Sequence, residues 1–222
     1  VLPQAALEDL GVSYREVLQV VEQAYKALRS GDSQNPLKTI VEPADRHSIS
    51  YSMVGRDGAS HTVGFKVVYE HDPQRTRDAY QFHSFIFLCD DRTGHPIALM
   101  DVVKLGPLGT SATSALRARA ACPDARTALV VGTGVQGQIA LPMLLAAMPD
   151  LERLYVYGHY AEGLRAVREN LHKHYPLRDV IVVDDLQAAA GEADIILGVA
   201  GLSARQQVQR AWLKPGAVAV LV

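Results

Sequence analysis

The sequence predicts an α/β protein in two parts: a Rossmann-type doubly wound parallel sheet at residues 123–222, preceded by an α+β domain at residues 1–122. Three observations support this fold class. The second part alternates continuous apolar strands with helices, as a parallel sheet covered on both faces requires. A glycine-rich turn follows the first of those strands. The first part has one amphipathic helix and several short strands joined by turns, which is typical of an antiparallel sheet.

Composition fits a folded cytoplasmic chain with a sizeable core. Nearly half of the 222 residues are apolar, at 48%. The formal net charge of −2 gives no electrostatic argument for nucleic acid or an anionic membrane as a partner. We find neither a signal peptide nor an apolar run that could span a bilayer. Cys89 and Cys122 are expected to be reduced, buried thiols, and they indicate a cytoplasmic location.

The first part begins with a helix. Ser13 and Glu16 form a capping box, apolar residues then recur at helical spacing, and Gly31 ends the helix. Alternating or β-branched runs predict five strands, of which the first is short. They are Leu37–Val41, Ile49–Met53, Val63–Tyr69, Phe82–Cys89 and Ile97–Met100, separated by turns at Gly55–Gly58 and Asp91–Gly94 and by a loop from His71 to Asp78.

The second part follows a helix predicted at Thr110–Ala121, which Pro123 ends. The predicted strands are Thr127–Val131, Leu154–Tyr157, Val180–Val183, Ile195–Val199 and Ala217–Val222, and the predicted helices are Gln136–Met148, Ala161–His174 and Leu186–Gly191. The chain stops at the carboxyl end of its last strand. Ligands bind at that edge of an open α/β sheet, so we expect a C-terminal segment that is missing from this sequence.

The motif Gly132–Gly137 has the G-x-G-x-x-G pattern of a dinucleotide-binding turn. Gly132 permits the tight turn, Gly134 lets the backbone approach a pyrophosphate, and Gly137 allows close packing of helix and strand. The helix N-terminus then faces the phosphates. Such a motif alone is weak evidence, but here a strand precedes it and a helix follows. The sequence therefore predicts binding of NAD or NADP.

The end of the second strand normally selects between these cofactors. An acid there binds the ribose hydroxyls of NAD, but this strand ends in Tyr157, Gly158 and His159. His159 could face the 2′-phosphate of NADP, which slightly favours that cofactor. It could equally be a solvent-exposed histidine on a turn.

Two lysines and a cluster of hydroxyl residues are further candidates. Lys66 lies in the middle of an apolar strand, on the face of Gly64 and Val68, where it either extends to solvent or is buried for a function. The strand context alone favours extension to solvent, and Lys38 would ordinarily be a surface residue. The hydroxyl residues Thr110, Ser111, Thr113 and Ser114 either cap a helix or donate to an anionic ligand.

Several motifs, taken in order and spacing, resemble the ornithine cyclodeaminase/mu-crystallin family across essentially the whole chain. The first is a "D-x-x-T-G-x-P-x-A-L" hairpin at 90–99. The others are the helix start at 110–115, the dinucleotide turn with its Gln at 132–136, and the segments 193–196 and 212–216.

The resemblance implies a homodimer that binds a nicotinamide dinucleotide. In the family, the N-terminal part and a C-terminal helix form the dimerisation and substrate domain, with the Rossmann domain between them. Members include ornithine cyclodeaminases, ketimine reductases, alanine dehydrogenases and amino-acid-forming enzymes of siderophore pathways. The family's substrate-binding Lys, in a "G-x-K" strand, matches Lys66. The implied cofactor-binding residues are Thr110, Thr113, Gly132, Gly134, Val135, Gln136, Gly158, His159 and Ala200.

The chain departs from the family pattern in its substrate site. Gly109 stands where the family has an Arg that grips the substrate carboxylate. Lys38 stands in place of a second carboxylate-binding Arg, and it keeps the charge but not the bidentate fork. Ala200 replaces a Thr common near the nicotinamide. The family's catalytic Asp would lie just past Val222.

Two hypotheses of different classes follow. The first is an ornithine cyclodeaminase-like enzyme that moves hydride between NAD or NADP and the α-carbon of an amino or imino acid, with Lys66 and Lys38 on the carboxylate. The loss of the Arg at Gly109 argues against ornithine, so an imine reductase or amino-acid dehydrogenase is the alternative. The second is a mu-crystallin-like protein that binds NADP and a ligand without turnover.

Overall fold

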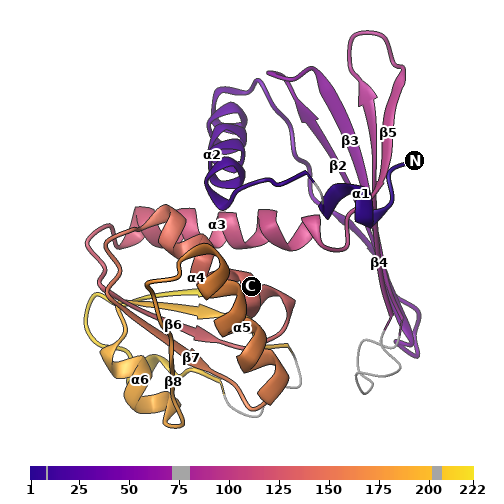
Figure 1. Cartoon of the computed structure of the whole chain (residues 1–222). Helices are drawn as coiled ribbons and strands as arrows, with labels where there is room; N and C mark the ends of the chain where they lie inside the picture. The colour runs from indigo at the N-terminus through magenta and orange to yellow at the C-terminus, as the bar shows by residue number, and fades with distance from the viewer. Residues whose placement is uncertain (9, 72–80, 202–206) are drawn as a thin grey trace. The chain divides into compact units, whose positions relative to one another are not determined.

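The computed structural model describes residues 1–8, 10–71, 81–201 and 207–222 and divides the chain into two compact units (Figure 1). The first unit comprises Val1–Val12 and Val20–Gly106, and the second comprises Ser13–Gln19 and Pro107–Val222. Helix α2 (Tyr14–Ser30) begins in the second unit and continues in the first. Most of helix α3 (Leu105–Ala121) groups with the second unit. The domain boundary between residues 122 and 123 stays a prediction.

The first unit contains the short helix α1 (Gln4–Glu8) and a five-stranded antiparallel sheet in the order β1-β2-β3-β4-β5. Its strands are β1 (Thr39–Val41), β2 (Ser48–Asp57), β3 (Thr62–His71), β4 (Gln81–Asp90) and β5 (Pro96–Asp101). All five predicted strands are confirmed. The capping box is confirmed too, because Glu16 N–H bonds to the Ser13 hydroxyl and Ser13 N–H to the Glu16 carboxylate. Most of the loop predicted from His71 lies outside the described residues.

The two faces of this sheet differ in exposure. The outer face carries large apolar side chains that are 37–48% exposed, namely Val54, Phe65, Val67, Tyr69, Phe85, Phe87 and Leu99. The opposite face, here called the lysine face, carries Lys66 between its cross-strand partners Met53 and Ile86. Val68 and Ser84 on the lysine face are buried. Side chains of a strand alternate between faces, so Lys66 and the exposed Phe65 and Val67 point in opposite directions.

The turn predicted at Gly55–Gly58 is wrong. Strand β2 continues to Asp57, Gly55 pairs with Gly64, and the turn occupies residues 58–61. The Asp57 carboxylate accepts hydrogen bonds from the amides of Ala59 and Ser60, at 3.4 and 3.0 Å. This side-chain cap moves the turn past the first glycine, because Asp readily bonds the backbone that follows it.

The predicted start of helix α3 is also wrong. The helix begins at Leu105 rather than Thr110, with the amide of Gly106 bonded to the carbonyl of Val102 at 2.8 Å. Pro107 falls in the first turn, where a missing N–H costs nothing. Thr110 therefore lies inside the helix, where its carbonyl accepts a bond from the Ser114 hydroxyl, and it cannot be the helix cap.

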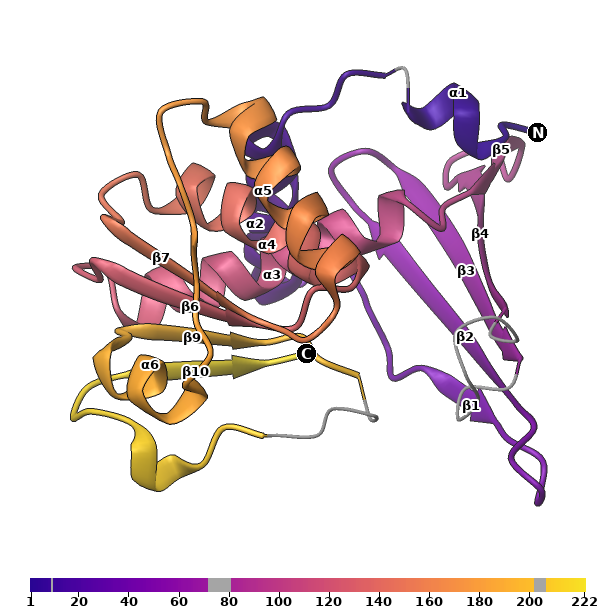
Figure 2. The same ribbon diagram turned by 60° about the horizontal axis from the view of Figure 1, so that its bottom comes forward.

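The second unit is a five-stranded parallel sheet in the order β10-β9-β6-β7-β8, which is the Rossmann strand order. Helices α4 and α5 lie on one face of it and α6 on the other (Figure 2). In chain order the elements are β6 (Thr127–Val131), α4 (Val135–Ala147), β7 (Arg153–Tyr157), α5 (Ala161–His174), β8 (Ile181–Val182), α6 (Leu186–Glu192), β9 (Ile195–Gly198), the 3₁₀ turn η1 (Arg210–Trp212) and β10 (Val218–Leu221). The predicted α/β class with a doubly wound parallel sheet is confirmed.

A carboxylate at the start of β9 joins neighbouring strands. Asp194 accepts hydrogen bonds from the amides of Arg126 and Thr127 before and at β6, at 2.9 and 2.8 Å. It also forms an ion pair of 2.6 Å with Lys214, which precedes β10. These bonds outweigh burial and lower the pKa of Asp194. The carboxylate therefore holds the starts of three strands, opposite the edge where ligands bind.

The two cysteines are less buried than the sequence predicts. Cys89 and Cys122 are free thiols, but both are half-buried rather than buried as predicted. Cys89 lies in β4 of the antiparallel sheet, near the end of the strand. None of the described helices is long and apolar enough to cross a membrane.

Candidate functional site

The dinucleotide turn lies between β6 and α4, where the strand order of the parallel sheet reverses. Strand β6 pairs with β7 on one side and β9 on the other, so the loops after β6 and β9 meet at the switch point. Gly132 has a φ of +118°. A Cβ there would lie 2.7 Å from the backbone nitrogen of Ala200. Only glycine permits this approach, which brings Gly132 and Ala200 together.

The other two glycines of the motif differ in what surrounds them. A Cβ at Gly137 would lie 2.0 Å from the carbonyl oxygen of Gly132, so helix α4 could not pack against the turn with a side chain there. A Cβ at Gly134 would meet nothing within 4 Å, and its φ of −72° and ψ of −168° admit any residue. The fold thus does not need a glycine at 134. The open space beside this helix N-terminus suits an anionic group.

The turn rests on the next βα loop through Thr133, which is 6% exposed. A Cβ at Gly158 would lie 2.6 Å from the Thr133 methyl carbon, and one at Gly163 would lie 2.6 Å from the Thr133 hydroxyl oxygen. Gly158 and Gly163 therefore make room for Thr133. Sequence reasoning missed Thr133 and Gly163, because only the fold shows that the two loops pack together.

Helix α3 joins the turn through Gln136. The Ser111 hydroxyl donates to the Gln136 side-chain carbonyl at 3.0 Å, and the Gln138 side-chain amide donates to the Thr133 carbonyl at 3.3 Å. Ser111 is buried on α3. The neighbouring candidates on α3 are Gly109, Thr110 and Thr113, all half-buried, and a Cβ at Gly109 would meet nothing within 4 Å.

The loop after β7 carries the candidate cofactor-selecting residues. His159 is exposed, and its Nε2 lies 2.9 Å from the hydroxyl of the buried Tyr157. Tyr160 bonds the carboxylate of Glu162, which lies in the first turn of α5. Sequence reasoning looked for an acid only at the strand end and missed Glu162. On the other side of the turn, Val135 is 59% exposed beside Gly134.

Lys66 is half-buried on the lysine face of the first unit. Its Nζ lies 3.4 Å from the position that a Cβ on Gly106 would occupy, and Gly106 is at the start of α3. Burial lowers the pKa of Lys66. Within the part of the chain that the structure describes, no carboxylate forms an ion pair with it. An anionic ligand would therefore supply the charge partner that the described residues do not provide.

Lys38 belongs to the same face of the sheet. Its ammonium lies 4.7 Å from the centroid of the Tyr51 ring, and Tyr51 pairs with Val68 on the lysine face. Such a cation–π contact holds a lysine head group without neutralising it. Both lysines of the first unit that the sequence singled out thus lie on the lysine face, whereas the other candidate residues belong to the second unit.

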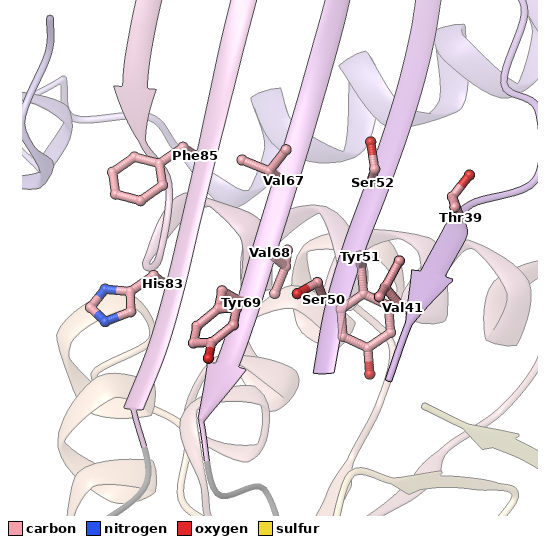
Figure 3. A pocket seen from close by; sticks show the side chains of 10 residues that line it. All are labelled: Thr39, Val41, Ser50, Tyr51, Ser52, Val67, Val68, Tyr69, His83 and Phe85. Carbon is pink, nitrogen blue, oxygen red and sulfur yellow. The ribbon is translucent and has the colours of Figure 1, made fainter. Parts of the chain in front are cut away.

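A hollow of about 260 Å³ lies on this sheet, lined largely from the outer face (Figure 3). Val67 and Tyr69 of β3 and His83 and Phe85 of β4 contribute to it. Its lining is mostly apolar and does not include Lys66. We therefore place the candidate substrate contacts at the lysines rather than in this hollow.

Comparison with known proteins agrees with the geometry. The solved Δ1-pyrroline-2-carboxylate reductase of Thermococcus litoralis, in complex with NADH and L-proline, matches with a TM-score of 0.85 and 25% identity over 100% of this chain and 68% of that one. An archaeal alanine dehydrogenase dimer with bound NAD matches with a TM-score of 0.80 and 19% identity over 98% and 65%.

A curated relative, the N-((2S)-2-amino-2-carboxyethyl)-L-glutamate dehydrogenase of Staphylococcus aureus, is 22% identical over 97% of this chain and 66% of its own length. The chain thus spans about two thirds of the length of each of these three relatives. The model of the ornithine cyclodeaminase/mu-crystallin family matches residues 2–222. This chain belongs to the ornithine cyclodeaminase/mu-crystallin family.

Proposed function

We propose that the protein is an NAD(P)-dependent oxidoreductase that moves hydride to or from the α-carbon of an amino or imino acid. The observation that carries the proposal is the open space beside Gly134, at a helix N-terminus and at the switch point of a Rossmann sheet. The fold does not require glycine there, and a ligand that approaches the backbone closely would require it. The relatives with bound NADH and NAD support a dinucleotide as that ligand.

The proposed cofactor site uses the second unit. The amides of Gly134, Val135 and Gln136 at the start of α4 would hold the pyrophosphate, since they lack helical acceptors. Ala200, next to Gly132, would line the nicotinamide end, and Thr110 and Thr113 of α3 would add hydroxyl contacts. When bound, the nicotinamide gives or takes the hydride. The loop with Gly158, His159 and Glu162 would face the ribose: His159 suits NADP, whereas Glu162 suits NAD.

The proposed substrate contacts use the first unit. Lys66 would bind the substrate carboxylate and hold the α-carbon in place, and Lys38 would add a second positive charge. Gly109 offers no positive charge, which disfavours ornithine, whose family partner there is an Arg. We favour reduction of an imine, with Δ1-pyrroline-2-carboxylate as the first substrate to test, because the Thermococcus litoralis relative is a reductase of that compound.

A second candidate function is ligand binding without turnover. Gly109 favours it, because the glycine removes a substrate contact while leaving the dinucleotide turn intact. The two candidates differ in one result. A protein that binds NADH or NADPH tightly, yet neither reduces any imino acid with them nor oxidises any amino acid with NAD+ or NADP+, would be a binding protein.

We propose further that the protein is a homodimer joined through the outer face of the first unit. The supporting observation is the row of exposed apolar side chains on β3 and β4, including Phe65, Val67 and Phe85. An exposed apolar face of this kind usually marks an interface. The alanine dehydrogenase relative is itself a dimer.

The free thiols Cys89 and Cys122 favour a cytoplasmic location.

The test is an assay of the full-length protein with NADH or NADPH and Δ1-pyrroline-2-carboxylate. We expect imine-dependent oxidation of one of the two cofactors and formation of proline. If a different imino acid, but not Δ1-pyrroline-2-carboxylate, causes oxidation of NADH or NADPH, the proposed reaction class stands and the proposed substrate is wrong. Binding of neither cofactor would refute the proposal.

A further inference from the structure

Helix α4 contains a proline at an interior position. Pro142 lies in the third turn, is buried, and has no N–H. In an α-helix the N–H of residue 142 would donate to the carbonyl of Gln138, four residues earlier. The Gln138 carbonyl therefore lacks its helical donor, and a half-buried carbonyl without a partner is costly.

Asn170 of the neighbouring helix supplies the missing donor. Its side-chain amide donates to the Gln138 carbonyl at 2.8 Å. Helices α4 and α5 lie side by side (Figures 1 and 2), which brings this amide to the gap left by Pro142. The same amide also donates to the hydroxyl of Tyr14, at the start of α2, at 2.9 Å. An asparagine amide has two N–H groups, so this one side chain links three helices.

Gln138 also bonds directly to the dinucleotide turn. Its side-chain amide donates to the carbonyl of Thr133, between Gly132 and Gly134. The backbone carbonyl of Gln138 is thus bonded to Asn170, and the side chain of Gln138 is bonded to the turn. Hydrogen bonds continue from α5 to the turn where the pyrophosphate would bind, and every residue of this chain of bonds belongs to the second unit.

We propose that Asn170 is a positioning residue for the dinucleotide: by replacing the helical bond that Pro142 removes, it holds Gln138 and, through it, the Gly132–Gly137 turn. The proposal rests on the proposed function, because it takes a nicotinamide dinucleotide as the ligand of that turn. Asn170 itself touches no part of the ligand. Its effect on binding is through the position of Gln138.

The test is a double-mutant cycle on the full-length protein with N170A, P142A and the combined variant. P142A restores a backbone N–H that can donate to the Gln138 carbonyl, so the helix no longer needs Asn170 for that bond. Y14F is the matched control, since it removes the other acceptor of the Asn170 amide and leaves the bond to Gln138. Dissociation constants for NADH and NADPH are measured by calorimetry well below the Tm of each variant, and Tm values are recorded alongside.

We expect N170A to weaken binding of the cofactor about three- to tenfold, which corresponds to one lost hydrogen bond. The combined variant should recover most of that affinity, and P142A and Y14F should bind like the wild type. A lowered Tm with unchanged dissociation constants in N170A would make Asn170 merely structural and overturn the proposal. Equal weakening in N170A and the combined variant would also overturn it, because the Gln138 carbonyl would then not be the link.

The cycle separates this proposal from the proposed function. If the wild type bound neither NADH nor NADPH, the proposed function would fall and the positioning role with it. The Tm values would still show whether N170A lowers the Tm of the P142A variant less than it lowers the Tm of the wild type. If the wild type bound a cofactor and N170A bound it equally well, only the role of Asn170 would be refuted.

Discussion

A half-buried lysine is the residue on which the proposed substrate site depends. Lys66 has a pKa lowered by burial, and the described carboxylates leave it without an ion pair. Sequence context alone favoured a side chain that extends to solvent, and only the resemblance to the family indicated a function. The structure adds what neither could supply, namely that Gly106 at the start of α3 lies beside its ammonium.

Replacing this lysine should affect substrate and not cofactor. A charge-assisted hydrogen bond contributes roughly 1.5–3 kcal/mol, so we expect K66M to lower kcat/KM for Δ1-pyrroline-2-carboxylate about ten- to a hundredfold. Calorimetry should find the dissociation constant of NADH or NADPH nearly unchanged. K173M, at an exposed lysine of α5, is the control and should behave like the wild type. Full activity in K66M would remove Lys66 from the substrate site.

The glycines show how far residue-level prediction reaches. Their motif predicted the turn, and the structure separates their tasks: Gly132 and Gly137 are required by close backbone contacts, whereas Gly134 is not. Sequence spacing could not distinguish these cases, because the distances depend on Ala200, more than sixty residues further along the chain, and on the packing of α4. The roles of Gly158 and Gly163 were hidden for the same reason.

At the scale of elements, periodicity located the strands and helices, and local chemistry shifted their ends. The Asp57 carboxylate caps a turn at residues 58–61 instead of the predicted 55–58. Pro107 did not prevent α3 from starting at Leu105. Glycine and proline discourage a helix by propensity, but they are tolerated in a first turn where the N–H groups have no helical acceptor. The bonds of Asp194 could not be predicted, because its partners lie far away in the sequence.

The Asp194 carboxylate predicts a pH-dependent stability of the parallel sheet. Its pKa is lowered in the folded state, so its contribution is present above the unfolded pKa and is lost as pH falls through the folded pKa. Hydrogen bonds to a charged group contribute roughly 1.5–3 kcal/mol, so D194N should lower the unfolding free energy near neutral pH by about that amount, as measured by urea denaturation.

The difference between D194N and the wild type should shrink in acid, because protonation then removes the same charge from the wild type. D150N, at an exposed aspartate before β7, is the control and should unfold like the wild type. A D194N protein with unchanged stability at neutral pH would show that the bonds to Arg126, Thr127 and Lys214 contribute nothing net.

At the scale of the whole molecule, the fold class follows from the alternation of apolar strands and helices, and the proposed dimer rests on the exposure of the outer face. The outer face leaves large apolar residues of β3 and β4 in contact with water. Sequence alternation alone predicted an antiparallel sheet but could not say which face stays uncovered. The division into units also depends on packing, since α2 and α3 each contribute to both.

The exposed face makes a prediction about oligomeric state. The full-length protein should sediment as a dimer at micromolar concentration, and V67K should shift it to monomer, because a lysine would then be buried without a partner in an apolar interface. Val67 is 48% exposed, so the fold should tolerate the change. I181K, at an exposed position of β8 in the other unit, is the control and should remain dimeric. A monomeric wild type would contradict the proposed interface.

The central claim is that the Gly132–Gly137 turn binds a nicotinamide dinucleotide, and Gly134 allows it to be tested without disturbing the fold. A Cβ at 134 would meet nothing within 4 Å apart from its neighbours in the chain, and the backbone angles there suit any residue. The measurement is a calorimetric titration of NADH and NADPH into the wild type and G134V, with the Tm of both. We predict that the wild type binds at least one cofactor and that G134V keeps its Tm but loses that binding, because the valine would occupy the place of the pyrophosphate. Equal affinity in the two proteins would contradict the claim.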